Sequence, residues 1–97
     1  MSDIFTACVN NDLILLDKII KERPADINLV NGGDPILIKA IVLNRDTFAE
    51  KLIEAGANVN IKNFLGETPL IKASALNREG IAKLLTFSLQ ILEYIFS

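Results

Sequence analysis

The sequence contains no histidine, no tryptophan and only one cysteine, Cys8. Histidine is the commonest general base in enzymes, and zinc sites draw mainly on histidine and cysteine. The Asp and Glu residues do not cluster at metal-ligand spacing either. We therefore expect a protein that is not an enzyme, with no catalytic residues, no metal site and no cofactor.

Positive charge and long apolar runs are also scarce. Ten Lys and Arg stand against twelve Asp and Glu, a net charge of −2, which gives no field for nucleic acid or an acidic membrane surface. No apolar stretch approaches the roughly 20 residues of a membrane-crossing helix. A lone cysteine cannot close a disulfide within the chain, and no cleavable signal sequence is evident, so we expect a cytoplasmic location and a partner other than nucleic acid or membrane.

A period of thirty-three residues dominates what is present. The segment 37–52, LIKAIVLNRDTFAEKL, aligns without a gap with the segment 70–85, LIKASALNREGIAKLL. A third, more degenerate copy starts the chain, and the positions that align across all three copies include Ala7, Ala40 and Ala73, and Asn11, Asn44 and Asn77. This self-similarity predicts a single domain, 1–97, built from three repeats at about 1–29, 30–62 and 63–97.

Each copy is expected to hold two short helices. Apolar residues recur at intervals of three and four on both sides of the repeated asparagine, as in Leu37 to Ile41 and Phe48 to Leu52. Asparagine tolerates, after glycine, the left-handed backbone that ends a helix and turns the chain sharply. The three asparagines therefore predict helix-turn-helix corners.

The segments between the helix pairs are rich in Gly, Asn and Pro, which predicts turns at 26–37 and 56–70. Gly56 is expected to close a helix as a left-handed cap, and Asn31-Gly32 is a strong hairpin signal. Thr68-Pro69 should begin the next helix with a capping hydroxyl and a proline at the first position. Asp34-Pro35 should do the same in the middle copy.

This thirty-three-residue unit of turn, helix and helix resembles the ankyrin repeat family, with GETPLIKA (66–73) opening the helix pair and LIEAGANVN (52–60) closing it. The resemblance covers residues 1 to about 87. Its most specific positions are Gly66, Thr68, Pro69, Leu70 and Ala73, and Leu52, Ile53, Gly56, Ala57, Val59 and Asn60. It implies an all-α ankyrin-like solenoid of stacked helix-turn-helix repeats with short projecting hairpin turns. It also implies that the chain binds a protein and catalyses no reaction.

The chain departs from the family pattern in three ways. In the middle copy Pro35 and Ile36 stand where Thr and Pro are expected, which moves the expected cap to Asp34. The histidine that follows the family's Pro-Leu pair is replaced by Ile38 and Ile71, which removes a group that would tie neighbouring turns together. The last copy has Ser88-Leu89-Gln90 where the closing Gly-Ala loop is expected.

The resemblance places partner contacts on the hairpin tips and the concave helix face. In this chain those positions are Asn31, Asp34, Val42, Leu43, Phe64, Leu65, Glu67, Ala75 and Leu76. Phe64 and Leu65 are large apolar residues at a tip that is normally solvated, so they are either a binding anchor or packed on an adjacent turn. Lys39 and Lys72 recur beside the expected groove, where they either select acidic partners or are simply solvated.

The carboxyl end is apolar around most of its helical circumference. One stripe holds Ile81, Leu84, Leu85, Leu89, Leu92 and Phe96, and a second holds Phe87, Ile91 and Tyr94. The first stripe can close the last repeat against its neighbour, while the second needs another cover. That cover is a tail that bends back to cap the stack, a second copy of the chain through Phe87, Ile91 and Tyr94, an external partner or a longer array.

The function expected first is a protein-interaction module, and the alternative is a self-associating element or part of a longer ankyrin array.

Overall fold

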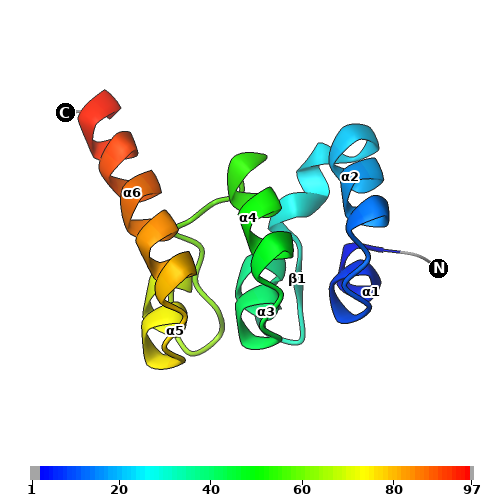
Figure 1. Cartoon of the computed structure of the whole chain (residues 1–97), viewed down its shortest axis with the longest axis horizontal. Coiled ribbons are helices and arrows are strands. Elements are labelled where there is room, and N and C mark those ends of the chain that lie inside the picture. Colours follow the sequence, from blue (N-terminus) through cyan, green and yellow to red (C-terminus); the bar gives the residue numbers. More distant parts are fainter. Residues whose placement is uncertain (1–2, 97) are drawn as a thin grey trace.

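The computed structural model describes residues 3–96, apart from the side chains of Leu92 and Phe96. Three helix pairs lie side by side along a body that measures 40 × 27 × 23 Å (Figure 1). The pairs are α1 (Ile4–Val9) with α2 (Leu13–Glu22), α3 (Ile36–Val42) with α4 (Asp46–Glu54), and α5 (Pro69–Ala75) with α6 (Glu79–Phe96). A short 3-10 helix, η1 (Pro24–Asn28), follows α2, and a minimal hairpin, β1 (Val30–Asn31) and β2 (Asp34–Pro35), precedes α3. The predicted all-α solenoid of stacked helix pairs is confirmed.

The repeated asparagines form the corners between paired helices. Asn11, Asn44 and Asn77 have φ values of 51°, 59° and 58°, in the left-handed region. At each corner the N–H of the following residue donates to the carbonyl of the repeated alanine, with a distance of 2.8 Å in all three copies. This bond satisfies a carbonyl that the helix end leaves without a partner. The corner prediction is confirmed in every copy.

Helix starts agree with the sequence in one repeat and differ in the next. Thr68 Oγ1 accepts a hydrogen bond from Ile71 N, and Pro69 occupies the first turn of α5, as predicted. The prediction that Asp34 caps α3 is wrong, because Asp34 belongs to β2 and Pro35 stands at the cap position without a side-chain bond. Strand pairing draws Asp34 into the hairpin, and the N–H of Ile36 donates instead to Leu29 O at 2.9 Å.

The hairpin has a register one residue later than its strongest sequence signal. Asn31 pairs with Asp34, so the two-residue loop is Gly32-Gly33 and not Asn31-Gly32. Both glycines have positive φ, 63° and 84°, as a primed hairpin turn requires at its two central positions. Two adjacent glycines satisfy that requirement because neither carries a side chain that disfavours positive φ.

The core runs along the whole stack and is centred on the middle repeat. The inner helix α3 lies between α1 and α5 and packs against both. The alanine of the thirty-three-residue period, Ala7, Ala40 and Ala73, is fully buried in each copy. A side chain of one methyl group allows neighbouring inner helices to approach closely, which explains its recurrence at this position. Phe48 and Leu52 of α4 fill the space behind α3.

Cys8 is fully buried in α1, and burial raises the pKa of its thiol to about 11. The thiolate is the reactive form, and at pH 8 it is about a hundredfold scarcer for a pKa of 11 than for an ordinary thiol with a pKa near 9. We therefore expect iodoacetamide to label Cys8 at least about a hundredfold more slowly in the folded chain than in denaturant. Mass spectrometry of timed samples measures both rates, and comparable rates would contradict this packing.

The carboxyl-terminal tail does not bend back onto the stack. Helix α6 continues without interruption from Glu79 to Phe96, and its second half leans away from α4 (Figure 1). The tail therefore does not cover the second apolar stripe, and the predicted alternative of an intramolecular cap is wrong. Ile81 and Leu85 of the first stripe are buried as predicted, whereas the side chains of Leu92 and Phe96 lie outside the described part of the chain.

Candidate functional site

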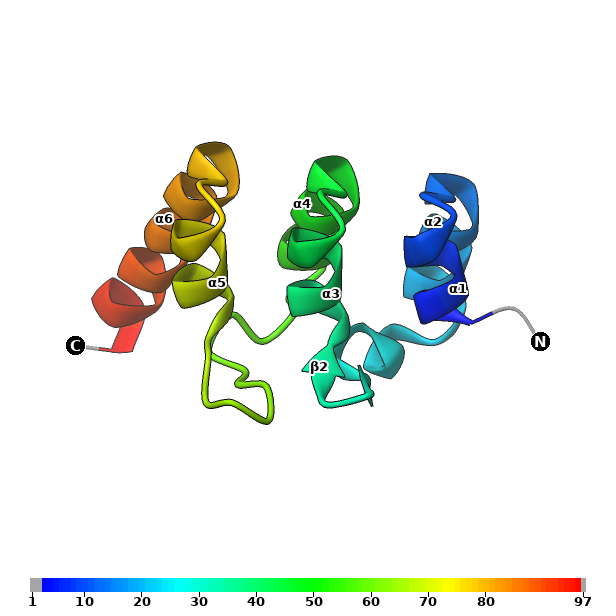
Figure 2. The same cartoon turned by 90° about the horizontal axis from the view of Figure 1, so that it is seen from below.

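The inner helices and the loops that precede them form one continuous face. Figure 2 shows α1, α3 and α5 in a row, with the β1-β2 hairpin below α3 and the loop that precedes α5 below α5, both on the same side of the row. The predicted contact residues occupy two parts of this face. The loop ends carry Asn31, Asp34, Phe64, Leu65 and Glu67, whereas Val42, Leu43, Ala75 and Leu76 lie at the far ends of α3 and α5.

Asn63 joins the two projecting loops, and it is the buried polar residue of the described chain. Its Nδ2 donates to Asp34 Oδ1 of the preceding repeat at 3.3 Å and to Glu67 Oε1 at 2.9 Å. Its Oδ1 accepts from Leu65 N and Glu67 N. Asn63 thus provides a link between neighbouring turns that Ile38 and Ile71 cannot provide.

Sequence reasoning did not single out Asn63. The only available signal was its chemistry, because an asparagine side chain commonly accepts a bond from the backbone two residues ahead and fixes a turn. Such asparagines are common in turns, and nothing in the pattern reveals that Asp34 would lie beside this one.

Phe64 is both packed and exposed. Its N–H donates to Gly33 O at 3.0 Å, and a Cβ built on Gly33 would lie 3.0 Å from Phe64 Cγ and closer still to Cδ1. The ring therefore rests on the bare backbone of the preceding hairpin. Its other side faces solvent, since Phe64 is 73% exposed and Leu65 is 65% exposed. Of the two interpretations offered by the sequence, packing on an adjacent turn is observed, and the role of Phe64 as a binding anchor stays a prediction.

A charged pair stands beside this tip. Lys72 Nζ lies 3.3 Å from Glu67 Oε1, so a lysine of the inner face is neutralised by the loop. The hydrogen bond from Asn63, helped by Lys72, lowers the pKa of Glu67 below its ordinary value. The ionised Glu67 carboxylate is therefore favoured where it accepts hydrogen bonds from Asn63 and Lys72.

Further bonds attach the first repeat to the second. Arg45 at the corner before α4 donates to Cys8 O at 3.2 Å and to Val9 O at 2.8 Å, at the end of α1. Lys51 of α4 and Asp17 of α2 form an ion pair of 3.1 Å. Asn58 N donates to Asn28 Oδ1 at 2.8 Å. These bonds join the first repeat to the second in addition to the apolar contacts between them.

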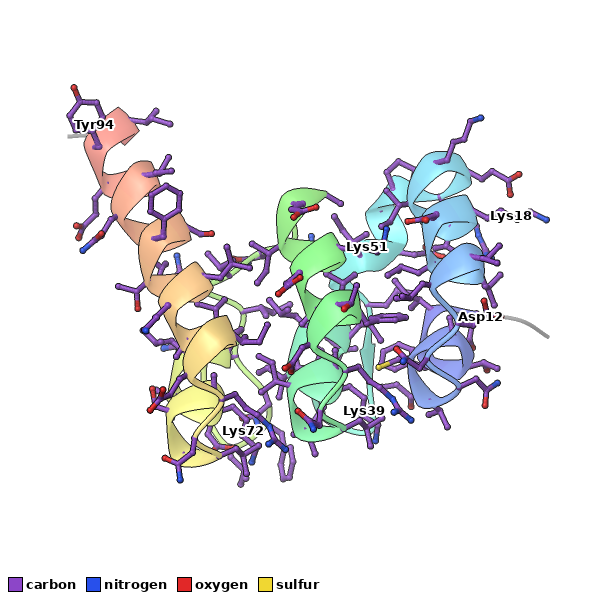
Figure 3. The ribbon with its side chains drawn as sticks, viewed as in Figure 1. Asp12, Lys18, Lys39, Lys51, Lys72 and Tyr94 are labelled. Carbon is purple, nitrogen blue, oxygen red and sulfur yellow. The ribbon has the colours of Figure 1, made fainter. Side chains whose placement is uncertain are left out.

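The second candidate surface is the open side of α6. Phe87, Ile91 and Tyr94 are all exposed there, and Tyr94 stands at the far end of the helix (Figure 3). Phe87 and Ile91 border a groove of about 330 Å³ whose opposite wall includes Ile53 and Val59. Self-association through this surface stays a prediction.

Within residues 3–96, no group of three or more His, Cys, Asp or Glu side chains is placed to hold a metal ion. The described helices include none with the length and apolar character needed to cross a membrane.

Comparison with known proteins agrees with this architecture. A family model described as ankyrin repeats, in three copies, matches residues 4–92. The ankyrin repeat protein YahD of Escherichia coli (strain K12) is 34% identical over 83 residues, which is 84% of this chain but 41% of that protein. No solved structure matches. Ankyrin repeats are in general protein–protein interaction modules and typically non-catalytic. The thirty-three-residue period, the asparagine corners and the stacked helix pairs agree with this family model, which covers nearly the full chain. The protein therefore belongs to the ankyrin repeat family.

Proposed function

We propose that this chain binds a protein partner across its concave face, with Phe64 and Leu65 as the anchor and no chemical step. The observation that carries the proposal is the exposure of these two large apolar side chains on a loop whose backbone is fixed. Apolar residues that concentrate on a surface mark interaction sites, and buried aromatic anchors contribute most of the energy of many interfaces.

The fixed loop reduces the cost of binding. Association loses affinity when loops and side chains must be ordered in the complex, at about 0.5–1.5 kcal/mol for each side chain immobilised. Asn63 already closes the loop, and the Gly33 backbone already supports the Phe64 ring. A partner therefore meets an anchor that is close to its bound position.

The net charge of −2 supports a protein over a nucleic acid as the partner. We also place the interaction in the cytoplasm, on the ground that a lone buried cysteine suits a reducing compartment. The other predicted contacts, Asn31, Asp34, Val42, Leu43, Glu67, Ala75 and Leu76, would surround the anchor or extend the contact toward the helix corners.

Replacing both anchor residues, Phe64→Ser with Leu65→Ser, is expected to weaken binding of the natural partner about thirtyfold or more. The reason is that a hot-spot residue contributes about 2 kcal/mol or more. The partner is first captured from cells that express the tagged chain and identified, and its affinity is then measured by titration calorimetry. Circular dichroism should show an unchanged helix content, because both side chains are largely exposed.

The matched control is Phe87→Ser with Ile91→Ser, which removes one aromatic and one aliphatic residue from the open side of α6. This pair should leave partner affinity within about twofold. If the control pair abolishes binding while the anchor pair does not, the concave-face proposal is wrong. Light scattering on the same samples shows whether the α6 surface joins two copies, since the control pair would then lower the mass.

A further inference from the structure

A second feature of the concave face lies at its amino-terminal end, between α1 and the β1-β2 hairpin. The chain forms a cleft of about 410 Å³ there, whose lining includes Phe5 and Val9 from α1, Asn31 and Gly32 from the hairpin, and Lys39 from α3. Among the described residues, the only acidic side chain that lines it is Asp3. The cleft is separate from the Phe64 tip and differs from it in having a lysine in its lining.

Lys39 and Lys72 occupy the same position of consecutive repeats (Figure 3), but their surroundings differ. Glu67 neutralises Lys72 at 3.3 Å. The residue that aligns with Glu67 is Asp34, whose side chain is one methylene shorter and accepts a hydrogen bond from Asn63 Nδ2 at 3.3 Å. Within the described residues no ion pair or hydrogen bond of the Lys39 side chain is found. Lys39 is half-buried, so its positive charge is uncompensated at the cleft.

Asp3 is not the ion-pair partner of Lys39 among the described residues. Its Oδ1 accepts a hydrogen bond from Thr6 N at 2.8 Å as the cap of α1, and this bond lowers the pKa of Asp3. Its carboxylate therefore serves as the N-cap of α1, and Asp3 forms no ion pair with Lys39 among the described residues. Arg45, the other cation near the end of α1, is engaged with Cys8 O and Val9 O. Lys39 is thus the cation at the cleft that remains available to a ligand.

The walls of the cleft are apolar on the α1 side. Val9 is exposed and Phe5 is half-buried, and both line the cleft with Lys39. A half-buried lysine gains a charge-assisted hydrogen bond from an incoming carboxylate, and such bonds are stronger than neutral ones. A simple inorganic anion would leave the apolar wall uncovered, whereas a peptide can bring a carboxylate and an apolar side chain together.

We infer that this cleft receives an acidic side chain from an extended segment of the protein partner, with the carboxylate on Lys39 Nζ and a neighbouring apolar side chain against Phe5 and Val9. The inference rests on the proposed function and names the chemistry of the partner: a peptide segment in which Asp or Glu is followed or preceded by an aliphatic or aromatic residue. Lys72 does not line this cleft, and its ammonium group already has Glu67 as an ion-pair partner.

The test is a selection of random 12-residue peptides, displayed on phage, against the full chain. We expect the selected peptides to be enriched in Asp or Glu beside a large apolar residue. The Lys39→Met chain keeps the length and apolar stem of the side chain but lacks the charge, so it should lose the acidic preference. The Lys72→Met chain is the matched control and should retain that preference. For one selected acidic peptide, titration should show about a tenfold loss of affinity with Lys39→Met and less than about twofold with Lys72→Met.

Three outcomes would overturn the inference: no peptide is selected, the acidic preference survives Lys39→Met, or both lysine variants lose it equally. The last would indicate a general response to charge and no defined contact. Circular dichroism of both variants shows whether each retains its helices. The proposed function fails by a different result, since it predicts that Phe64→Ser with Leu65→Ser weakens the natural partner whether or not Lys39 selects an acidic peptide.

Discussion

Replacing Phe48 with alanine is expected to lower the free energy of unfolding by about 3–5 kcal/mol, the usual range for a buried phenylalanine. Phe48 lies in α4 of the middle repeat with 0% of its surface exposed. A chain of 97 residues is typically stable by about 5–15 kcal/mol, so this change would remove a large part of the total. A repeat stack holds together only through contacts between neighbours, and damage to the middle repeat weakens both junctions.

Urea unfolding followed by circular dichroism measures this loss, with the same substitution at Phe87 as the control. Phe87 is 59% exposed, so Phe87→Ala should change the free energy of unfolding by no more than about 0.5 kcal/mol. Equal effects at the two positions would show that the core does not run through α4 as described. A broadened transition for Phe48→Ala would indicate that the outer repeats unfold separately.

The parts of the fold that follow from local rules could be predicted from the sequence. Asn11, Asn44 and Asn77 each end a helix because the left-handed conformation disfavours most other residues, and this requirement is independent of distant contacts. Thr68 and Pro69 begin α5 for equally local reasons. The alignment of 37–52 with 70–85 also predicted that each copy holds the same pair of helices, because similar sequences fold in the same way.

The features that depend on neighbouring repeats could not be predicted. Asp34 failed as a helix cap because its hairpin partner Asn31 and the incoming Asn63 determine its position, and neither contact can be deduced from spacing. The course of α6 also depends on packing, because an apolar tail that folds back and one that runs straight have the same periodicity. The contact surface was predicted as a set of positions, yet the support of Phe64 by Gly33 appeared only in three dimensions.

The two glycines of the hairpin loop, Gly32 and Gly33, differ in whether they contact the Phe64 ring. Both have positive φ, so an alanine at either position costs about 1–2 kcal/mol in backbone strain. At Gly32 the added methyl group would meet nothing within 4 Å, whereas at Gly33 it would overlap the ring of Phe64. We therefore expect Gly33→Ala to lower the free energy of unfolding by about 2–4 kcal/mol and Gly32→Ala by about half as much, since overpacking adds about 1–3 kcal/mol.

A double-mutant cycle separates the clash from the strain. If the ring causes the additional cost, Gly33→Ala in a Phe64→Ser background should cost no more than Gly32→Ala, which corresponds to a coupling energy of about 1–3 kcal/mol. Urea unfolding of the single and double variants supplies all the values. Absence of coupling would show that Phe64 does not rest on Gly33. Gly33→Ala should also weaken the natural partner, because it displaces the ring that we propose as the anchor. A hairpin glycine of one repeat would then control binding through the loop of the next, and that dependence is possible only where neighbouring repeats share one surface.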